Sequence, residues 1–115
     1  MSSAKVTVYV LQLNDRKQFY IGATARRWED RIMDIALGID IPVFVRGKRF
    51  GVEETISNVT PLEELTTTLR YMKAYGPNRV RGACFSNMSL RADQINTIAS
   101  FMDIVATCET YLIGH

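Results

Sequence analysis

The chain has 115 residues, of which 47% are hydrophobic and 23% charged, and its formal net charge is +2. This length supports one domain, spanning residues 1–115, and the hydrophobic fraction argues against disorder. No apolar run approaches the ~18 residues of a membrane span, and the first residues lack the apolar core of a signal peptide. We therefore expect an intracellular protein of the cytoplasm or nucleus.

Histidine and cysteine usage narrows the possible chemistry. The only histidine, His115, is the last residue, which argues against a zinc site, a histidine base and a histidine-based triad. Cys84 and Cys108 have no motif spacing, so we expect two packed, reduced thiols.

The charge is unevenly distributed along the chain. Residues 1–31 carry six basic and three acidic groups, residues 32–69 carry three basic and six acidic groups, and residues 70–91 carry five basic groups and no acid. The two basic segments would form a phosphate-binding face if the fold brings them together. The alternative is that these charges only solvate the surface.

The N-terminal third predicts a β-hairpin. Residues 6–13 are rich in β-branched residues and contain few polar ones, which indicates a buried strand. Residues 14–17 form a polar turn, and residues 18–23 return as a second strand. Tyr9 and Tyr20 then lie on paired strands. Gly22 ends the second strand, where a missing side chain allows a ligand or another backbone to approach closely.

The next segment predicts a helix, a loop and a third strand. Residues 41–49 contain Pro42 and are expected to be extended or loop, and residues 51–59 form the third strand. Gly38 is placed to end the preceding helix. That helix is predicted over residues 26–37, with an inward stripe of Trp28, Ile32, Ile35 and Ala36.

A second helix begins with a capping signal. Thr60 suits the N-cap, Pro61 the first helical position, and Glu63 completes a capping box. Gly76 and Pro77 end the helix. Its predicted buried stripe consists of Leu62, Leu65, Leu69 and Met72.

The remaining residues predict a connector and a third helix. Residues 80–85 form a connector or a short strand, and a helix follows from Ser89 with Ile95, Ile98, Met102 and Val105 at spacings of three and four. This order predicts an α/β (α+β) fold, in which helices flank a small three-stranded antiparallel sheet. The residues expected to be buried together are Trp28, Ile32, Leu65, Leu69, Ile95, Ile98 and Met102.

The hairpin and the first helix carry a family resemblance. Residues 7–9 and 20–22 resemble the paired motif of the GIY-YIG nuclease superfamily, with Thr7 in place of the first glycine and the two tyrosines eleven positions apart. Arg31 resembles the catalytic arginine of the following helix. Residues 71–76 and 80–82 are similar to a subgroup of small, stand-alone, often viral members, so the resemblance covers roughly residues 6–82.

The resemblance implies an endonuclease that acts on nucleic-acid phosphodiesters. Its expected partner is DNA, its expected cofactor is Mg²⁺ or Mn²⁺, and no small-molecule cofactor is expected. The implied catalytic residues are Tyr9, Tyr20 and Arg31, with Arg27 as the alternative to Arg31. The candidate nucleic-acid contacts are Gly22, Arg26, Lys73 and Arg81.

The metal ligand departs from the family pattern. The resemblance aligns Met72 and Lys73 with an aliphatic residue and a lysine, which puts the family's glutamate at Thr68. A neutral threonine cannot replace a ligand that a hard divalent cation requires to be charged. Glu64, one turn earlier on the same helix face, is the remaining metal candidate. The sequence therefore predicts an intact phosphate-binding half and an impaired metal-binding half.

Several alternatives remain open from the sequence. The two tyrosines could be ordinary strand aromatics, and Arg31 could be a surface charge paired to Asp34. Arg81 could bind phosphate or pair internally with Glu53 or Glu54. The alternative function is a non-cleaving module on the same fold that binds nucleic acid or a protein partner.

Overall fold

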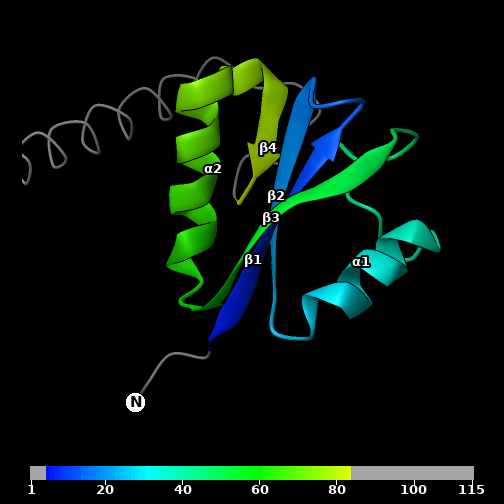
Figure 1. The fold of residues 1–115 in the computed structure, drawn as a ribbon, viewed down its shortest axis with the longest axis vertical. Helices are drawn as coiled ribbons and strands as arrows, with labels where there is room; N and C mark the ends of the chain where they lie inside the picture. Colours follow the sequence, from blue (N-terminus) through cyan, green and yellow to red (C-terminus); the bar gives the residue numbers. More distant parts are fainter. Residues whose placement is uncertain (1–4, 84–115) are drawn as a thin grey trace, which may run out of the picture.

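A computed structural model describes residues 5–83, which form a four-stranded mixed sheet with one helix on each face (Figure 1). The α+β class is confirmed, but the three-stranded antiparallel sheet is wrong because a fourth strand is present. The elements in chain order are β1 (Val6–Leu13), β2 (Gln18–Thr24), α1 (Trp28–Ala36), β3 (Phe50–Val59), α2 (Leu62–Tyr75), the 3₁₀ turn η1 (Pro77–Arg79) and β4 (Val80–Gly82).

The sheet has the order β3-β1-β2-β4. β1 lies antiparallel to both β2 and β3, whereas β4 lies parallel to β2. A parallel neighbour requires a crossover connection rather than a tight turn. Here β3 and α2 lie between β2 and β4 in the chain. The predicted connector after α2 is thus the short edge strand β4, which lies beside β2. Arg81 of β4 pairs with Tyr20 of β2.

The predicted hairpin is confirmed. Its turn contains three consecutive residues with positive φ, Asn14, Asp15 and Arg16, at 50°, 60° and 67°. Asn and Asp tolerate this left-handed region better than most residues, which explains why a turn forms here without glycine. The Lys17 N–H donates to the Leu13 carbonyl at 3.0 Å and closes the turn.

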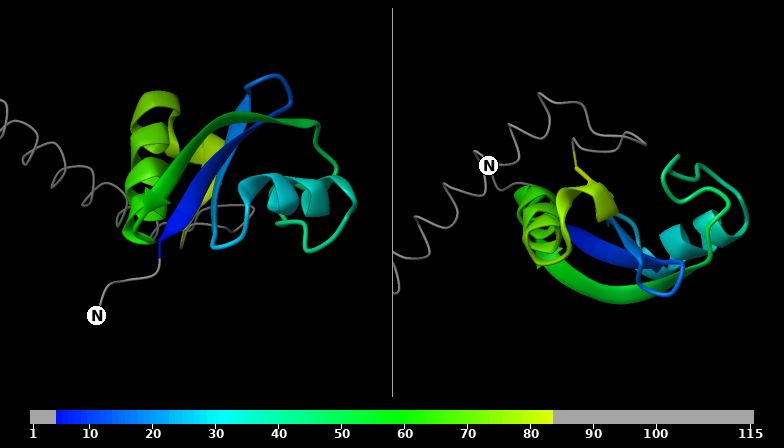
Figure 2. Two further views of the ribbon diagram at one scale, coloured as in Figure 1. Left: turned by 60° about the horizontal axis from the view of Figure 1, so that its bottom comes forward. Right: turned by 90° about the horizontal axis from the view of Figure 1, so that it is seen from above.

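The two helices lie on opposite sides of the sheet (Figure 2), and we call these sides the α1 face and the α2 face. Successive residues of a strand point to opposite faces, so β1 serves two apolar clusters at once. The cluster on the α2 face contains Val8, Val10, Phe19, Ile21, Leu69, Tyr71, Met72 and Val80. The cluster on the α1 face contains Tyr9, Leu11, Leu13, Ile35, Phe44 and Val45.

The expectation of one shared core is therefore wrong. Ile32 packs against the α1-face cluster, whereas Leu65 and Leu69 belong to the α2 face. Trp28 is half-buried. The sheet separates the two helices, so their apolar stripes cannot meet. The predicted third helix, its residues Ile95, Ile98 and Met102, and both cysteines lie outside the described residues.

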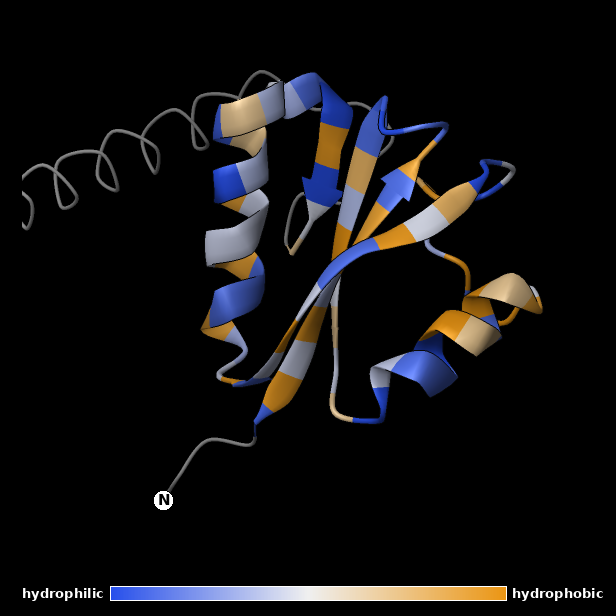
Figure 3. Ribbon diagram, viewed as in Figure 1, coloured by the Kyte–Doolittle hydropathy of each residue, from blue (hydrophilic) through white to orange (hydrophobic). Residues whose placement is uncertain are grey.

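Both helices are slightly shorter than predicted. α1 ends before Gly38, whose φ of +83° suits a helix terminus, but Ala36 is exposed rather than inward. Met33 in α1 and Leu37 directly after it are exposed. Hydrophobic colours also dominate the later part of α1 in Figure 3. Neither helix of residues 5–83 is long and apolar enough to cross a membrane.

The start of α2 differs from the predicted capping box. The N-cap is Pro61, no side chain caps the helix, and the Glu63 carboxylate instead accepts a hydrogen bond from the Thr67 hydroxyl at 3.5 Å. Leu62 is 67% exposed and does not belong to the buried stripe. The helix ends before Gly76, as predicted, and Gly76 adopts a φ of +95°.

Candidate functional site

The phenol ring of Tyr9 lies across the backbone of Gly22. The two residues are partners in the β1–β2 register, and Tyr9 is only 2% exposed. A Cβ atom built on Gly22 would lie 2.3 Å from both Cζ and the hydroxyl oxygen of Tyr9, too close for any side chain. The close approach predicted at Gly22 is thus made by Tyr9. The glycine positions a catalytic candidate and is not itself an open nucleic-acid contact.

Arg31 extends from α1 to the Tyr9 hydroxyl. The Arg31 side chain lowers the pKa of this phenol through hydrogen bonding and through its charge, although burial has the larger effect and raises the pKa. The guanidinium also donates to the carbonyl oxygens of Ile39, at 3.3 Å, and Asp40, at 2.8 Å. These bonds to the segment after α1 fix the orientation of Arg31.

Tyr20 is half-buried on the same face as Tyr9, and its phenol is neutral near pH 7. Burial is the main cause that raises the pKa of Tyr20 to about 12, and the neighbouring Tyr9 and the charge of Glu64 act in the same direction. The charge of Arg31 lowers it. Tyr9, Tyr20 and Arg31 thus lie close enough for their side chains to affect one another, and Glu64 lies within electrostatic range of both phenols.

Glu64 occupies the first turn of α2, where its carboxylate is half-buried. Burial raises the pKa of this carboxyl group. Its side chain forms no ion pair or hydrogen bond with any other residue in the range 5–83. A partly desolvated carboxylate without a cation beside it is a suitable ligand for a divalent ion. Mg²⁺ commonly uses one or two carboxylates and completes its shell with water and substrate phosphate.

Thr68 faces the interior and not the tyrosines. Its side chain is fully buried, and its hydroxyl donates to the Glu64 carbonyl at 2.7 Å. On its other side, a Cβ atom on Gly82 would lie 2.7 Å from the Thr68 hydroxyl oxygen. Thr68 therefore offers no open position for an ion, and its match to the family's glutamate position stays a prediction. Glu64 is the carboxylate of α2 whose charge raises the pKa of both phenols.

Arg26 and Arg27 are exposed and already paired with carboxylates. Arg26 donates to Asp34 at 2.8 Å, and Arg27 donates to Glu29 at 2.9 Å. Asp34, the alternative partner considered for Arg31, thus belongs to Arg26. Arg31 forms no ion pair within residues 5–83. This difference favours Arg31 over Arg27 as the phosphate-binding arginine.

Arg81 is internal. It is 2% exposed, and its Nη1 atom donates to the carbonyl oxygens of Pro77 and Val80 at 2.8 Å each. Of the carboxylates suggested as partners, Glu53 pairs with Arg16 and Glu54 with Arg70. Burial lowers the pKa of Arg81. At this depth Arg81 cannot contact a nucleic-acid phosphate directly.

Lys73 lies at the opposite end of α2 from Glu64. It is exposed in the last turn of α2, nine residues after Glu64, which corresponds to roughly 13 Å along a helix. A phosphate contact at Lys73 would therefore belong to a distant part of a long ligand.

Two residues that the sequence did not single out lie near this cluster. Phe44 is 2% exposed and packs in the α1-face cluster, and the Nζ atom of Lys48 lies 3.7 Å from its ring centroid. The run of three cations in residues 46–49 was the available sequence signal. Nothing local in that run distinguishes Lys48 from its neighbours.

Comparisons of the chain with protein-family models, with curated proteins and with solved structures find no match. The support for a function therefore comes from two sources. These are the motif resemblance and the arrangement of Tyr9, Tyr20, Arg31 and Glu64.

Proposed function

We propose that this chain is a metal-dependent endonuclease of the GIY-YIG type that hydrolyses nucleic-acid phosphodiesters, with DNA as the expected substrate. The observation that supports it most is the convergence of Tyr9, Tyr20, Arg31 and Glu64. These four residues come from four different elements, β1, β2, α1 and α2. They are also the residue types that the resemblance implies for phosphate binding, positioning of the nucleophile and metal binding.

Arg31 is the proposed phosphate ligand. A guanidinium has five N–H donors, and the carbonyl oxygens of Ile39 and Asp40 accept from only two of its nitrogens. No carboxylate within residues 5–83 neutralises it, so its charge is available to a phosphate oxygen. Charge-assisted bonds from arginine to phosphate are among the stronger hydrogen bonds in proteins.

The two tyrosines are proposed to orient the phosphate and the attacking water. A phenol with a raised pKa keeps its proton at neutral pH, so Tyr9 and Tyr20 act as hydrogen-bonding groups and not as permanent anions. Tyr9 is held between Gly22 and Arg31, which fixes its hydroxyl. Holding reactants in a reactive geometry lowers the barrier by making the step effectively unimolecular.

Glu64 is the proposed metal ligand. A divalent ion, when bound, stabilises the charge that develops on the phosphate and lowers the pKa of a bound water. The carboxylate must be ionised to hold it. Because burial raises the pKa of Glu64, we expect metal-dependent cutting to be present above that pKa. Cutting should be lost as the pH falls through it, at a higher pH than an exposed glutamate would give.

A plasmid-nicking assay with Mg²⁺ or Mn²⁺ tests this proposal. The wild type should nick supercoiled DNA, chelation should stop the reaction, and Tyr20→Phe should reduce it strongly. Tyr75→Phe is the matched control, because the Tyr75 hydroxyl contacts Arg16 on the α2 face. Salt-sensitive duplex binding without nicking would favour the non-cleaving binding module. The absence of both would favour a protein-interaction module.

A further inference from the structure

Cations in the described residues differ in whether they form ion pairs. Five arginines form ion pairs with carboxylates, whereas Arg46 and Lys48, in the loop between α1 and β3, form none within residues 5–83. The two residues flank Gly47, whose φ of +72° turns the backbone between them. The five paired arginines are Arg16, Arg26, Arg27, Arg49 and Arg70.

Lys48 shares one aromatic ring with a second cation. Its Nζ atom lies 3.7 Å from the centroid of Phe44, and the Cζ atom of Arg81 lies 5.0 Å from the same centroid. The ring is attractive to each cation, but the two cations repel each other. Burial and the charge of Arg81 together lower the pKa of Lys48. An anion beside Lys48 would relieve both effects, since its negative charge would favour the charged form of Lys48.

This pair of cations lies next to the candidate active site. Arg81 of β4 is the direct register partner of Tyr20 of β2, and neighbouring strands are about 4.8 Å apart. Phe44 belongs to the α1-face cluster, against which Tyr20 also packs. A nucleic-acid strand with one phosphate at Arg31 and Tyr20 can therefore continue along this face towards Lys48.

We propose that Lys48 binds a backbone phosphate of the nucleic acid, next to the phosphate held at Arg31, and so sets the path of the strand across the α1 face. This inference rests on the proposed function, because it names a further contact of the same substrate. Lys48 makes the contact, and the exposed Arg46 adds positive charge to the same loop. Arg81 is too buried to touch the ligand and acts through its charge behind the Phe44 ring.

The test measures duplex DNA binding without metal over a range of salt concentrations. Each phosphate contact contributes about 0.9 to the slope of log K against log salt concentration. Lys48→Gln should therefore bind more weakly and lower the magnitude of this slope by about 0.9. Lys17→Gln, on the exposed hairpin turn, makes the same charge change and should leave the slope as in the wild type. Equal slopes for Lys48→Gln and the wild type would overturn the proposal.

Two further measurements separate this inference from folding and from catalysis. Lys48→Arg keeps the charge over Phe44 and should restore the wild-type slope, whereas a slope like that of Lys48→Gln would overturn the proposal. Inorganic phosphate should slow acetylation of Lys48 in the wild-type protein but not acetylation of Lys17. Equal rates with and without phosphate would count against an anion site. These outcomes do not depend on cutting, so a failed nicking assay leaves them intact.

Discussion

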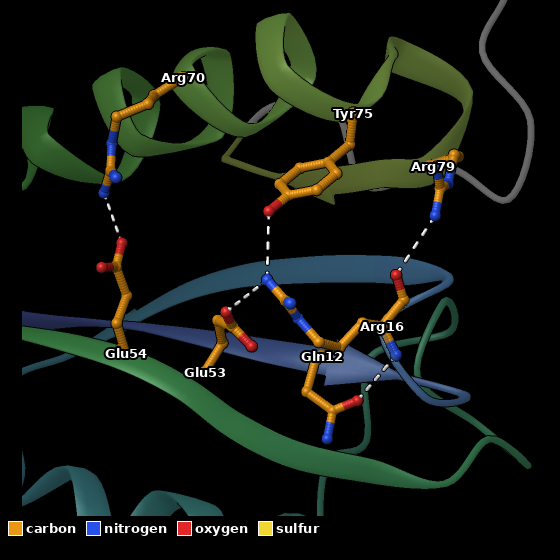
Figure 4. A network of polar contacts seen from close by, with 7 residues as sticks. All are labelled: Gln12, Arg16, Glu53, Glu54, Arg70, Tyr75 and Arg79. Carbon is orange, nitrogen blue, oxygen red and sulfur yellow. Dashed lines mark hydrogen bonds and ion pairs between the residues drawn. The ribbon is translucent and has the colours of Figure 1, made fainter.

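The two faces of the sheet differ in how their arginine and lysine side chains are paired. On the α2 face, Arg16 pairs with Glu53 at 2.9 Å and also donates to the Tyr75 hydroxyl at 3.2 Å, and Arg70 pairs with Glu54 (Figure 4). On the α1 face, the half-buried cations Arg31 and Lys48 have no carboxylate partner within the part of the chain that the structure describes. The α2-face ion pairs connect separate elements, whereas Arg31 and Lys48 have no such pair within residues 5–83.

The α2 face also holds the fold together through aromatic contacts. The rings of Phe19 and Tyr75 lie 4.4 Å apart, and those of Phe19 and Tyr71 lie 5.2 Å apart. Arg79 donates to the carbonyl oxygens of Lys17 at 2.7 Å and Arg16 at 3.2 Å, which attaches the hairpin turn to η1. We therefore expect substitutions at these α2-face contacts to change stability, and substitutions in the cluster of Tyr9, Tyr20, Arg31 and Glu64 to change cutting.

The largest expected effect comes from placing a charge inside the α2 side. Thr68→Glu would bury a carboxylate between the Glu64 carbonyl and Gly82, where the Thr68 side chain contacts no cation within residues 5–83. Uncompensated buried charges typically cost about 3–5 kcal/mol. We expect a loss of unfolding free energy of that size in chemical denaturation. Thr66→Glu, on the exposed side of α2, should change it by less than about 0.5 kcal/mol. Equal costs would mean that Thr68 is accessible.

The second prediction concerns catalysis at the cluster of Tyr9, Tyr20, Arg31 and Glu64. Glu64→Gln removes the charge that a divalent ion requires but keeps the shape of the side chain. We expect the nicking rate to fall about 10²–10³-fold, which corresponds to about 2.7–4 kcal/mol in the barrier. Metal-free DNA binding should remain. Glu63→Gln is the neighbouring control, since its amide still accepts from the Thr67 hydroxyl. A similar loss of nicking in both variants would show that nicking requires the total negative charge of the first turn of α2 and not Glu64 in particular.

Local signals in the sequence predicted much of the fold. The polar residues 14–17 specify the hairpin turn, and Gly76 followed by Pro77 specifies the end of α2. These features depend on backbone preferences of a few adjacent residues. The strand β4 has only three residues and exists because β2 lies beside it. A pattern within those residues cannot predict such a partner. The single core was predicted wrongly because β1 is apolar on both faces, which hides its alternation.

The closeness of Tyr9, Tyr20 and Gly22 could be predicted from the hairpin, whereas the position of each α2 side chain depends on packing. Tyr9, Tyr20 and Gly22 follow from strand pairing alone. The choice between Glu64 and Thr68 requires the rotation of α2 on the sheet, which helical spacing leaves open because the two residues lie on the same helix face. The proposed role of Lys48 could not be predicted, because it rests on the contact of Lys48 with the Phe44 ring and on the nearby Arg81. Arg81 is more than 30 positions away in the sequence.

The third prediction sharpens the role of Gly22. Gly22→Ala would place a methyl group 2.3 Å from the Tyr9 ring, so the ring must leave its present position between Gly22 and Arg31. Overpacking of this kind costs about 1–3 kcal/mol, and we expect nicking to fall because the Tyr9 hydroxyl loses its position. Gly51→Ala is the matched glycine in β3. Its nearest atom, at 2.6 Å, is the flexible end of Gln12, so both stability and nicking should change little. Retained nicking by Gly22→Ala would remove Tyr9 from the site.

The smallest expected effect concerns the ion pair of Arg16 and Glu53 on the α2 face. The side chains of Arg16 and Glu53 are 57% and 25% exposed, and solvent screens most of their attraction. We expect Glu53→Gln to lower the unfolding free energy by about 0.2–1 kcal/mol at low salt, and by less at high salt. Because Arg16 lies on the face opposite the phenols, duplex binding and its salt slope should match the wild type. A stronger DNA affinity in Glu53→Gln would show that Arg16, once released, binds phosphate. The division of charge between the two faces would then not be a division of function.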